Sequence, residues 1–281
     1  MDTDLFRGVG EPDLSGLLKR FFGYEKFRPL QEEVMRDALS GHDTFVLMPT
    51  GGGKSLCYQL SALARGGLTI VVSPLIALMK DQVDALQEAG VAATFLNSTL
   101  DVSESRRRLA GLYNGEYRLL YVAPERLMLP EMLERLDEWK PAQIAIDEAH
   151  CISDWGHDFR PDYRRIKDLI NFLPRNTPVV ACTATANDRV VEDVSKQLGD
   201  SITLSRGPLA REGLSLVAHN LQKQSHRLAW LARFIPEFKG TGIIYCLTKS
   251  DTEEVCAWLK SQGISALAYH GDTPTDERPI I

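Results

Sequence analysis

The first residues that suggest chemistry form a glycine-rich loop, MPTGGGKS, over positions 48–55. Glycines let backbone N–H groups turn inward around a phosphate chain, and a helix start adds the positive end of its dipole. Lys54 can reach the outer phosphates, and the Ser55 hydroxyl can hold a magnesium ion. Met48 stands where the pattern GxxxxGK[ST] has its first glycine, so an incidental glycine-rich turn is the alternative. The order of strand, loop and helix favours a nucleotide site that includes Thr50, Gly51, Gly52 and Gly53.

A second set of chemically active residues, DEAH at positions 147–150, follows the apolar run 144–146. Ligand sites in open α/β sheets lie at the carboxyl ends of strands. Asp147 is placed to hold Mg²⁺ directly or through water, and Glu148 to orient and deprotonate an attacking water. An acidic strand end is the alternative for DEAH alone. An upstream phosphate loop favours an ATP-hydrolysing site.

Short β-branched runs alternate with longer helical runs and predict the elements that position these residues. This alternation indicates an α/β fold with a mostly parallel sheet and helices on both faces. Helices are expected over 56–64, over 75–89 and after a cap at Asn187. Strands are expected over Thr44–Met48, Leu68–Val72, Ala92–Leu96, Tyr117–Val122, Gln143–Ile146 and Val179–Cys182.

The segment Ser205–Gly213 interrupts this alternation with Gly, Pro and charge, and is interpreted as an interdomain linker. We therefore expect a first domain over 1–206 and a partial second one over 207–281. The second domain is expected to contain the strands Leu214–His219, Gly242–Cys246 and Ala266–Tyr269, and the helices Gln224–Phe234 and Asp251–Gln262.

Composition narrows the class of protein. The 281 residues carry 32 Lys+Arg against 38 Asp+Glu, a net charge of -6, which excludes a globally basic nucleic-acid binder but allows a local basic track. No run approaches the ~20 apolar residues of a membrane span, and the acidic N-terminus lacks a signal peptide's apolar core. Five scattered cysteines without a CxxC pair indicate reduced thiols. The expected location is cytoplasmic.

Several motifs together make residues 14–272 resemble the RecQ family of superfamily 2 DNA helicases, whose motor domains are RecA-like P-loop NTPase domains. MPTGGGKS is that family's form of the phosphate loop, which accounts for Met48. Residues 22–31 are similar to its adenine-recognition element. The resemblance implies that Tyr24 stacks on the base, that Gln31 reads its edge and that Arg28 lies beside the nucleotide. Where the family usually has Gly, this chain has Leu30.

Other matches lie where the family contacts nucleic acid. Segments 72–75 with 80–82, 97–98 and 122–127 resemble its strand-contacting motifs, which implicates Ser73 and Asn97. Residues 181–186, with Thr183 and Thr185, match the motif that couples ATP state to domain movement.

The segment 152–161, ISDWGHDFRP, resembles the family's aromatic-rich loop. Trp155 and Phe159 offer π faces on which bases can stack at ~1–3 kcal/mol each, while His157 and Arg160 add hydrogen bonds and charge. The alternative is a pair of core aromatics, but a loop so rich in polar residues is poor core material. His150 lacks a second ligand at metal spacing, and the resemblance implies that it links the ATP site to this loop.

The resemblance implies a helicase that uses ATP and Mg²⁺ to move 3′ to 5′ along single-stranded DNA and to unwind partly duplex DNA in repair and recombination. In a bacterium it would be cytoplasmic and associated with the nucleoid. The family's arginine finger has no equivalent up to Ile281, so we expect a chain truncated within the second motor domain, with weak ATPase activity. The alternatives are an ATP- and DNA-binding module without unwinding activity, and an RNA-directed DEAH motor.

Overall fold

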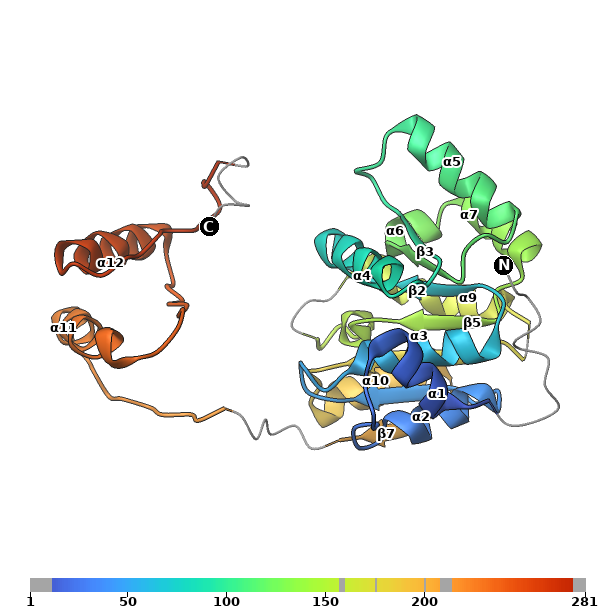
Figure 1. Ribbon diagram of the computed structural model, residues 1–281, viewed down its shortest axis with the longest axis horizontal. Helices are drawn as coiled ribbons and strands as arrows, with labels where there is room; N and C mark the ends of the chain where they lie inside the picture. Colours follow the sequence, from blue (N-terminus) through green and yellow to red (C-terminus); the bar gives the residue numbers. More distant parts are fainter. Residues whose placement is uncertain (1–11, 157–159, 175, 200, 208–213, 275–281) are drawn as a thin grey trace. The chain divides into compact units, whose positions relative to one another are not determined.

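The computed structural model describes residues 12–156, 160–174, 176–199, 201–207 and 214–274 (Figure 1). The chain divides into two compact units, Met1–Glu212 and Gly213–Ile281. The first unit contains a seven-stranded sheet in the order β3-β4-β2-β5-β6-β1-β7, and every pair is parallel. Its strands are β1 (Thr44–Leu47), β2 (Thr69–Val72), β3 (Ala93–Leu96), β4 (Leu119–Val122), β5 (Gln143–Ile146), β6 (Val179–Thr183) and β7 (Thr203–Arg206).

Helices cover both faces of this sheet and create two cores. One core contains α1 (Leu14–Leu17), η2 (Leu18–Phe22), α2 (Gln31–Leu39), α3 (Lys54–Arg65) and α4 (Ile76–Glu88). The other contains α5 (Val102–Tyr113), α6 (Pro124–Leu127), α7 (Pro130–Trp139), η3 (Ala149–Ile152), α8 (Pro161–Arg164), α9 (Ile166–Phe172) and α10 (Asp188–Leu198). The predicted α/β fold class is therefore confirmed.

The register of the central strands determines which residues meet at the carboxyl edge of the sheet. Leu47 of β1 is paired with Thr183 of β6, and Ile146 of β5 is paired with Val72 of β2. The residues that follow β1, β2, β5 and β6 therefore leave the sheet side by side. The phosphate loop, Ser73, Asp147 and the segment after Thr183 all lie at this edge.

The interpretation of Ser205–Gly213 as a linker is partly wrong. Ser205 and Arg206 end the edge strand β7, which pairs with β1, while residues 208–213 lie outside the described residues. Only Ser205 of this strand is buried, so its sequence lacks the apolar run of the interior strands. Pairing with β1, and not local hydrophobicity, determines that this segment is a strand.

The second unit contains α11 (Gln224–Phe234), η4 (Ile235–Glu237) and α12 (Lys249–Ser261). The helix α11 has the predicted bounds, and Trp258 Nε1 donates to the carbonyl of Leu228, 3.0 Å away, between α11 and α12. The three strands expected here are wrong, because residues 214–274 contain no strand. Strands require hydrogen-bonded neighbours, and these segments have none, so apolar residues such as Leu216 and Tyr245 are exposed.

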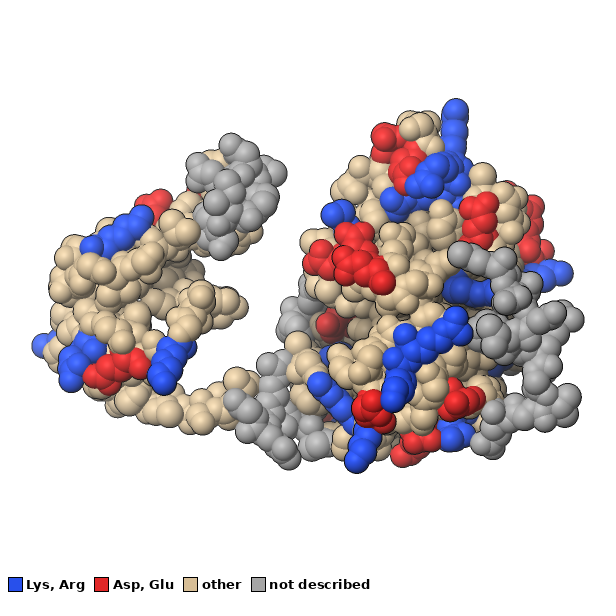
Figure 2. Space-filling model, in the orientation of Figure 1, with Lys and Arg blue, Asp and Glu red and all other residues tan. Residues whose placement is uncertain are grey.

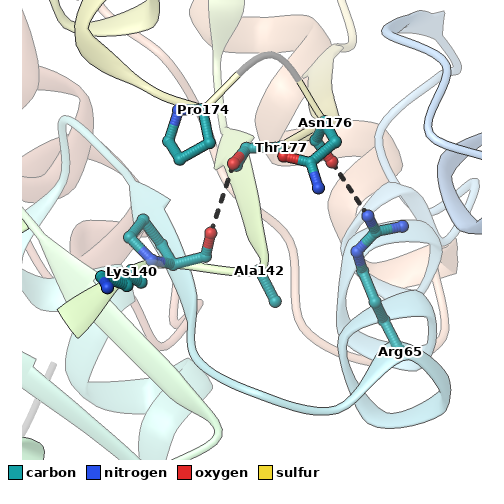
Figure 3. Close-up of a pocket in the computed structure, with 7 residues that line it drawn as sticks. Arg65, Lys140, Ala142, Pro174, Asn176 and Thr177 are labelled. Atoms are coloured by element: carbon teal, nitrogen blue, oxygen red, sulfur yellow. Dashed lines mark hydrogen bonds between the residues drawn. The ribbon is translucent and has the colours of Figure 1, made fainter. Parts of the chain in front are cut away.

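A surface pocket lies at the opposite edge of the sheet, beside the residues that precede β5 and β6 (Figure 3). Arg65, at the end of α3, donates from its guanidinium to the carbonyls of Asn176 and Ala38. Thr177 donates to the carbonyl of Pro141. None of the predicted site residues lines this pocket. Within the described part of the chain, no helix is long and apolar enough to cross a bilayer.

Candidate ATP and nucleic-acid site

The phosphate loop connects β1 to α3 in a shape that strongly favours glycine at two positions. Gly51 and Gly53 have φ of 79° and 83°, in the left-handed region that side chains disfavour. A Cβ at Gly52 would lie 2.8 Å from the carbonyl oxygen of Pro49, so a side chain there would meet the backbone. Lys54 begins α3, and its Nζ lies 3.3 Å from the carbonyl oxygen of Met48. The loop therefore forms a concave surface of backbone groups, and the Lys54 ammonium lies beside it.

The predicted adenine-recognition element is attached directly to this loop. Gln31 is buried, accepts the backbone N–H of Arg28 at 2.8 Å and donates to the carbonyl of Gly53 at 3.1 Å. The Arg28 guanidinium donates to the carbonyl of Gly51. Tyr24 is 56% exposed, so its ring is accessible for stacking. Leu30 has φ of 68°, which explains physically why glycine suits this position.

Asp147 and Glu148 follow β5 in different environments. Asp147 is 6% exposed and accepts the backbone N–H of Glu148 at 3.1 Å. Burial, and then the negative charge of Glu148, raise the pKa of Asp147 from 3.8 to about 6. Glu148 is half-buried with φ of 49°, an unfavourable conformation for a side-chain-bearing residue. The backbone therefore holds the two carboxylates in distinct positions.

The residues at this edge fit a nucleotide and a hard cation. The Asp147 carboxylate and the Ser55 hydroxyl are oxygen ligands, which suit Mg²⁺. A cation beside Asp147 would offset the cost of burying its charge. No cluster of three His, Cys, Asp or Glu side chains that could hold a metal occurs among the described residues, and Mg²⁺ normally completes its shell with phosphate oxygens and water.

His150 joins the acidic motif to β6. Its Nδ1 lies 2.8 Å from the Thr183 hydroxyl and 3.3 Å from the Glu148 carboxylate. The Thr183 hydroxyl also accepts the backbone N–H of Thr185 at 3.3 Å. His150 and Thr183 are buried, so movement of either segment changes contacts of the other.

The start of the predicted aromatic loop lies against α10. Trp155 is 54% exposed, so it is not a core residue, and its ring lies under the Arg189 guanidinium at 3.2 Å from the ring centroid. Ser153 donates to Asp193 at 2.6 Å and accepts the backbone N–H of Trp155 at 3.2 Å. His157 and Phe159, which the sequence also implicates, lie outside the described residues.

Arg160, Ser73 and Asn97 occupy the part of the edge nearer β2 and β3. The Arg160 guanidinium donates to the carbonyl of Pro74 at 2.9 Å, which links the loop to the segment after β2. Ser73 and Asn97 are each 1% exposed, and the Ser73 hydroxyl and the Asn97 amide nitrogen have no hydrogen-bond partner within the described chain. The structure thus groups them at the predicted edge but below its surface.

Comparison with known proteins identifies the family. The profile described as DEAD/DEAH box helicase matches residues 28–194. The chain belongs to the DEAD/DEAH box helicase family. Along 284 residues it is 42% identical to ATP-dependent DNA helicase RecQ of Haemophilus influenzae, covering 100% of this chain and 45% of that protein. The RecQ of Bacillus subtilis is 43% identical over 93% of this chain and 44% of its own length. The resemblance to RecQ helicases is confirmed, and the chain spans less than half of these relatives.

Solved helicase structures share the fold. The helicase MrfA bound to DNA and AMPPNP has a TM-score of 0.71 at 17% identity, covering 95% of this chain and 41% of its own. A single-substitution variant of Saccharomyces cerevisiae Dbp5 bound to RNA and ADP BeF3 has a TM-score of 0.69 at 19% identity, covering 98% of this chain and 71% of its own. At these identities the likeness supports the α/β architecture alone.

Several residues that hold this candidate site together were missed by sequence reasoning. Arg189 and Asp193 lie one turn apart on α10 and hold the aromatic loop. Tyr163 is buried and donates its hydroxyl to the carbonyl of Asp147 at 3.0 Å. Arg126 was not missed, because it lies in the predicted strand-contacting segment 122–127, and it donates to the carbonyl of Asn97 at 2.9 Å. The i, i+4 spacing of Arg189 and Asp193 was the one signal available, because the other contacts are far apart in sequence.

Charges on the visible face of the first unit are mixed, with lysine, arginine and acidic side chains interspersed (Figure 2). The basic run at 106–108 is partly neutralised within its own helix, since Arg107 and Arg108 both pair with Glu104 at 2.7 Å. Arg107 is exposed, whereas Arg108 is mostly covered and also donates to the carbonyl of Phe95.

Proposed function

We propose that this chain carries the motor core of an ATP-dependent DNA helicase, which couples ATP hydrolysis to 3′–5′ movement on single-stranded DNA and to unwinding. The observation that carries the proposal is the grouping of the phosphate loop, the two carboxylates and the Trp155 loop at one sheet edge. In this proposal residues 1–206 form the first motor domain, and 207–281 belong to a second.

The proposed nucleotide roles follow from the contacts. Residues 50–53 wrap the phosphates, and Lys54 neutralises the outer ones once it leaves the loop carbonyls. Ser55 and Asp147 hold Mg²⁺, and Glu148 takes a proton from the attacking water. On the base side, the proposed contacts are Tyr24, Arg28 and Gln31.

The proposed DNA contacts come from the loop and from the ends of β2 and β3. Exposure of Trp155 supports stacking on bases, and Arg160 supplies charge beside it. His157 and Phe159 are assigned to the same surface by the sequence. His150, Thr183 and Thr185 would pass changes between Glu148 and the loop. Ser73 and Asn97 would contribute polar groups after a local shift. The proposed location is cytoplasmic, in association with the nucleoid if the protein is bacterial.

The test is ATP turnover by this chain, and by a polypeptide extended to the length of the relatives, with no nucleic acid, single-stranded DNA, tailed duplex DNA or RNA. Stimulation by single-stranded DNA, with little by RNA, is expected. Stimulation by RNA alone would instead favour the RNA-directed motor. Nucleotide and DNA binding without turnover in the extended polypeptide would favour a binding module. Strand displacement on 3′-tailed and 5′-tailed duplexes tests the polarity.

A further inference from the structure

A buried polar cluster joins α3, which starts at the phosphate loop, to α4 on the same face of the sheet. Gln59 of α3 is 6% exposed, and its Nε2 donates to Oε1 of Gln82 on α4 at 2.8 Å. The same nitrogen donates to the hydroxyl of Tyr121 on β4 at 2.9 Å. An amide with both N–H bonds directed at fixed acceptors has one favoured orientation. The sheet residue Tyr121 therefore directs Gln59 toward Gln82.

The α3 end of this cluster responds to the nucleotide site through the helix itself. Gln59 lies about one and a half turns beyond Lys54 in a single helix. Protein interiors are close-packed, so a helix moves as a body more readily than it deforms. A shift of the phosphate loop on binding ATP would consequently displace Gln59 relative to the sheet.

The α4 end is attached to the aromatic loop. Pro74 precedes α4 by two residues, and its carbonyl accepts from the Arg160 guanidinium at 2.9 Å. Ser73, beside it, keeps a buried hydroxyl without a partner in the described chain. The segment that leads into α4 thus contacts the proposed DNA-binding loop, and α4 contacts the nucleotide-site helix near its middle.

We propose that Gln59, Tyr121 and Gln82 are positioning residues that transmit the state of the nucleotide site to the start of α4, where DNA is bound. This inference rests on the proposed function. The resemblance grouped Gln82 with strand-contacting residues, whereas its amide oxygen is engaged by Gln59. A contact that differs between two states changes an affinity only by its difference in free energy. A difference of one net hydrogen bond between the two states corresponds to an effect of roughly threefold to tenfold on the coupling.

The experiment measures the affinity of the 281-residue chain for a fluorescent oligothymidylate, without nucleotide and with saturating Mg²⁺ and a non-hydrolysable ATP analogue. The ratio of the two dissociation constants is the coupling factor. In Gln59→Leu this factor is expected to fall at least roughly threefold toward one, while affinity for the analogue alone stays within about twofold. Tyr121→Phe removes only a hydroxyl and should lower the factor by a smaller amount with the fold intact.

Gln87→Leu is the matched control, because Gln87 is also on α4 but donates to the carbonyl of Ala93 at 2.9 Å. Its coupling factor should equal that of the wild type. A Gln59→Leu, Gln82→Leu double variant should be no worse than Gln59→Leu alone, the signature of one shared contact.

An unchanged factor in both Gln59→Leu and Tyr121→Phe would overturn the inference, as would an equal fall in Gln87→Leu. If the wild type bound neither ligand, or bound DNA equally with and without the analogue, the proposed function would fail, and the inference with it. The wild-type measurement therefore separates the two failures.

Discussion

The buried Asp147 carboxylate should destabilise the nucleotide-free protein, although it is proposed to hold Mg²⁺. Asp147→Asn is therefore expected to make the protein more stable and less able to bind Mg²⁺-nucleotide. The carboxyl is buried, and its pKa is raised from 3.8 to about 6 by burial and by Glu148. A carboxyl with a raised folded pKa stabilises the fold below its unfolded pKa, and this stability is lost as pH rises through the folded pKa.

The magnitude follows from the size of the shift. About two pKa units correspond to on the order of 3 kcal/mol in the free energy of unfolding, lost between about pH 4 and pH 6. At pH 7.5 Asp147→Asn removes this penalty with little change of shape. A domain of about 200 residues gains roughly 2–4 °C in Tm per kcal/mol, so a rise of several degrees is expected.

The assay is thermal unfolding at pH 7.5 and pH 5, in EDTA and with Mg²⁺ plus a non-hydrolysable ATP analogue. The gain of Asp147→Asn over wild type should shrink at pH 5, where the wild-type carboxyl is largely protonated. Ligand should stabilise the wild type and have little effect on the variant. The control is Asp101→Asn, because hydrogen bonds at the start of α5 lower the pKa of Asp101, so loss of its charge should not stabilise. A lower Tm for Asp147→Asn in EDTA at pH 7.5 would refute the reasoning.

Three further predictions concern the same edge. Lys54→Ala should reduce any ATP turnover by about 10²–10³-fold with an unchanged Tm, measured by phosphate release and thermal unfolding. Glu148→Gln should keep affinity for a fluorescent ATP analogue while turnover falls about 10²–10⁴-fold, and an equal fall in affinity would assign Glu148 to binding instead. Trp155→Ala should leave basal ATPase nearly unchanged but remove most stimulation by single-stranded DNA. Loss of every activity together with a large fall in Tm would contradict this role.

The strands that sequence predicted best are those covered on both faces. β1, β2, β5 and β6 are buried throughout, so their residues are apolar almost throughout and recognisable from the sequence. β7 was missed because an edge strand with one buried residue has no such pattern. The segments around Leu216 and Tyr245 have the apolar pattern of strands, but no neighbouring strand pairs with them among residues 214–274. Strand pairing depends on residues far apart in the sequence, so local composition does not predict it.

The candidate site was predictable where its residues are adjacent in sequence. All the residues of MPTGGGKS lie in one loop, and those of DEAH lie at one strand end. The types and spacing of these residues were therefore enough to predict their part of the site. The contacts of Gln31 with Gly53 and of Arg189 with Trp155 join segments that only the fold brings together. The resemblance implied a base-reading role for Gln31, whereas its contact with the phosphate loop required coordinates.

Backbone strain and buried charge occur together at this edge. Among the described residues, three non-glycine residues have positive φ. Two of them are at this edge: Leu30 precedes Gln31, which contacts the phosphate loop, and Glu148 belongs to the acidic motif. Each such conformation costs about 1–3 kcal/mol and persists only where surrounding structure enforces it. Asp147 adds an ionised carboxyl that the fold disfavours at neutral pH. The concentration of these costs where Mg²⁺ and nucleotide would offset them argues that this edge is shaped for a ligand, because ligand binding restores the stability that the free fold lacks.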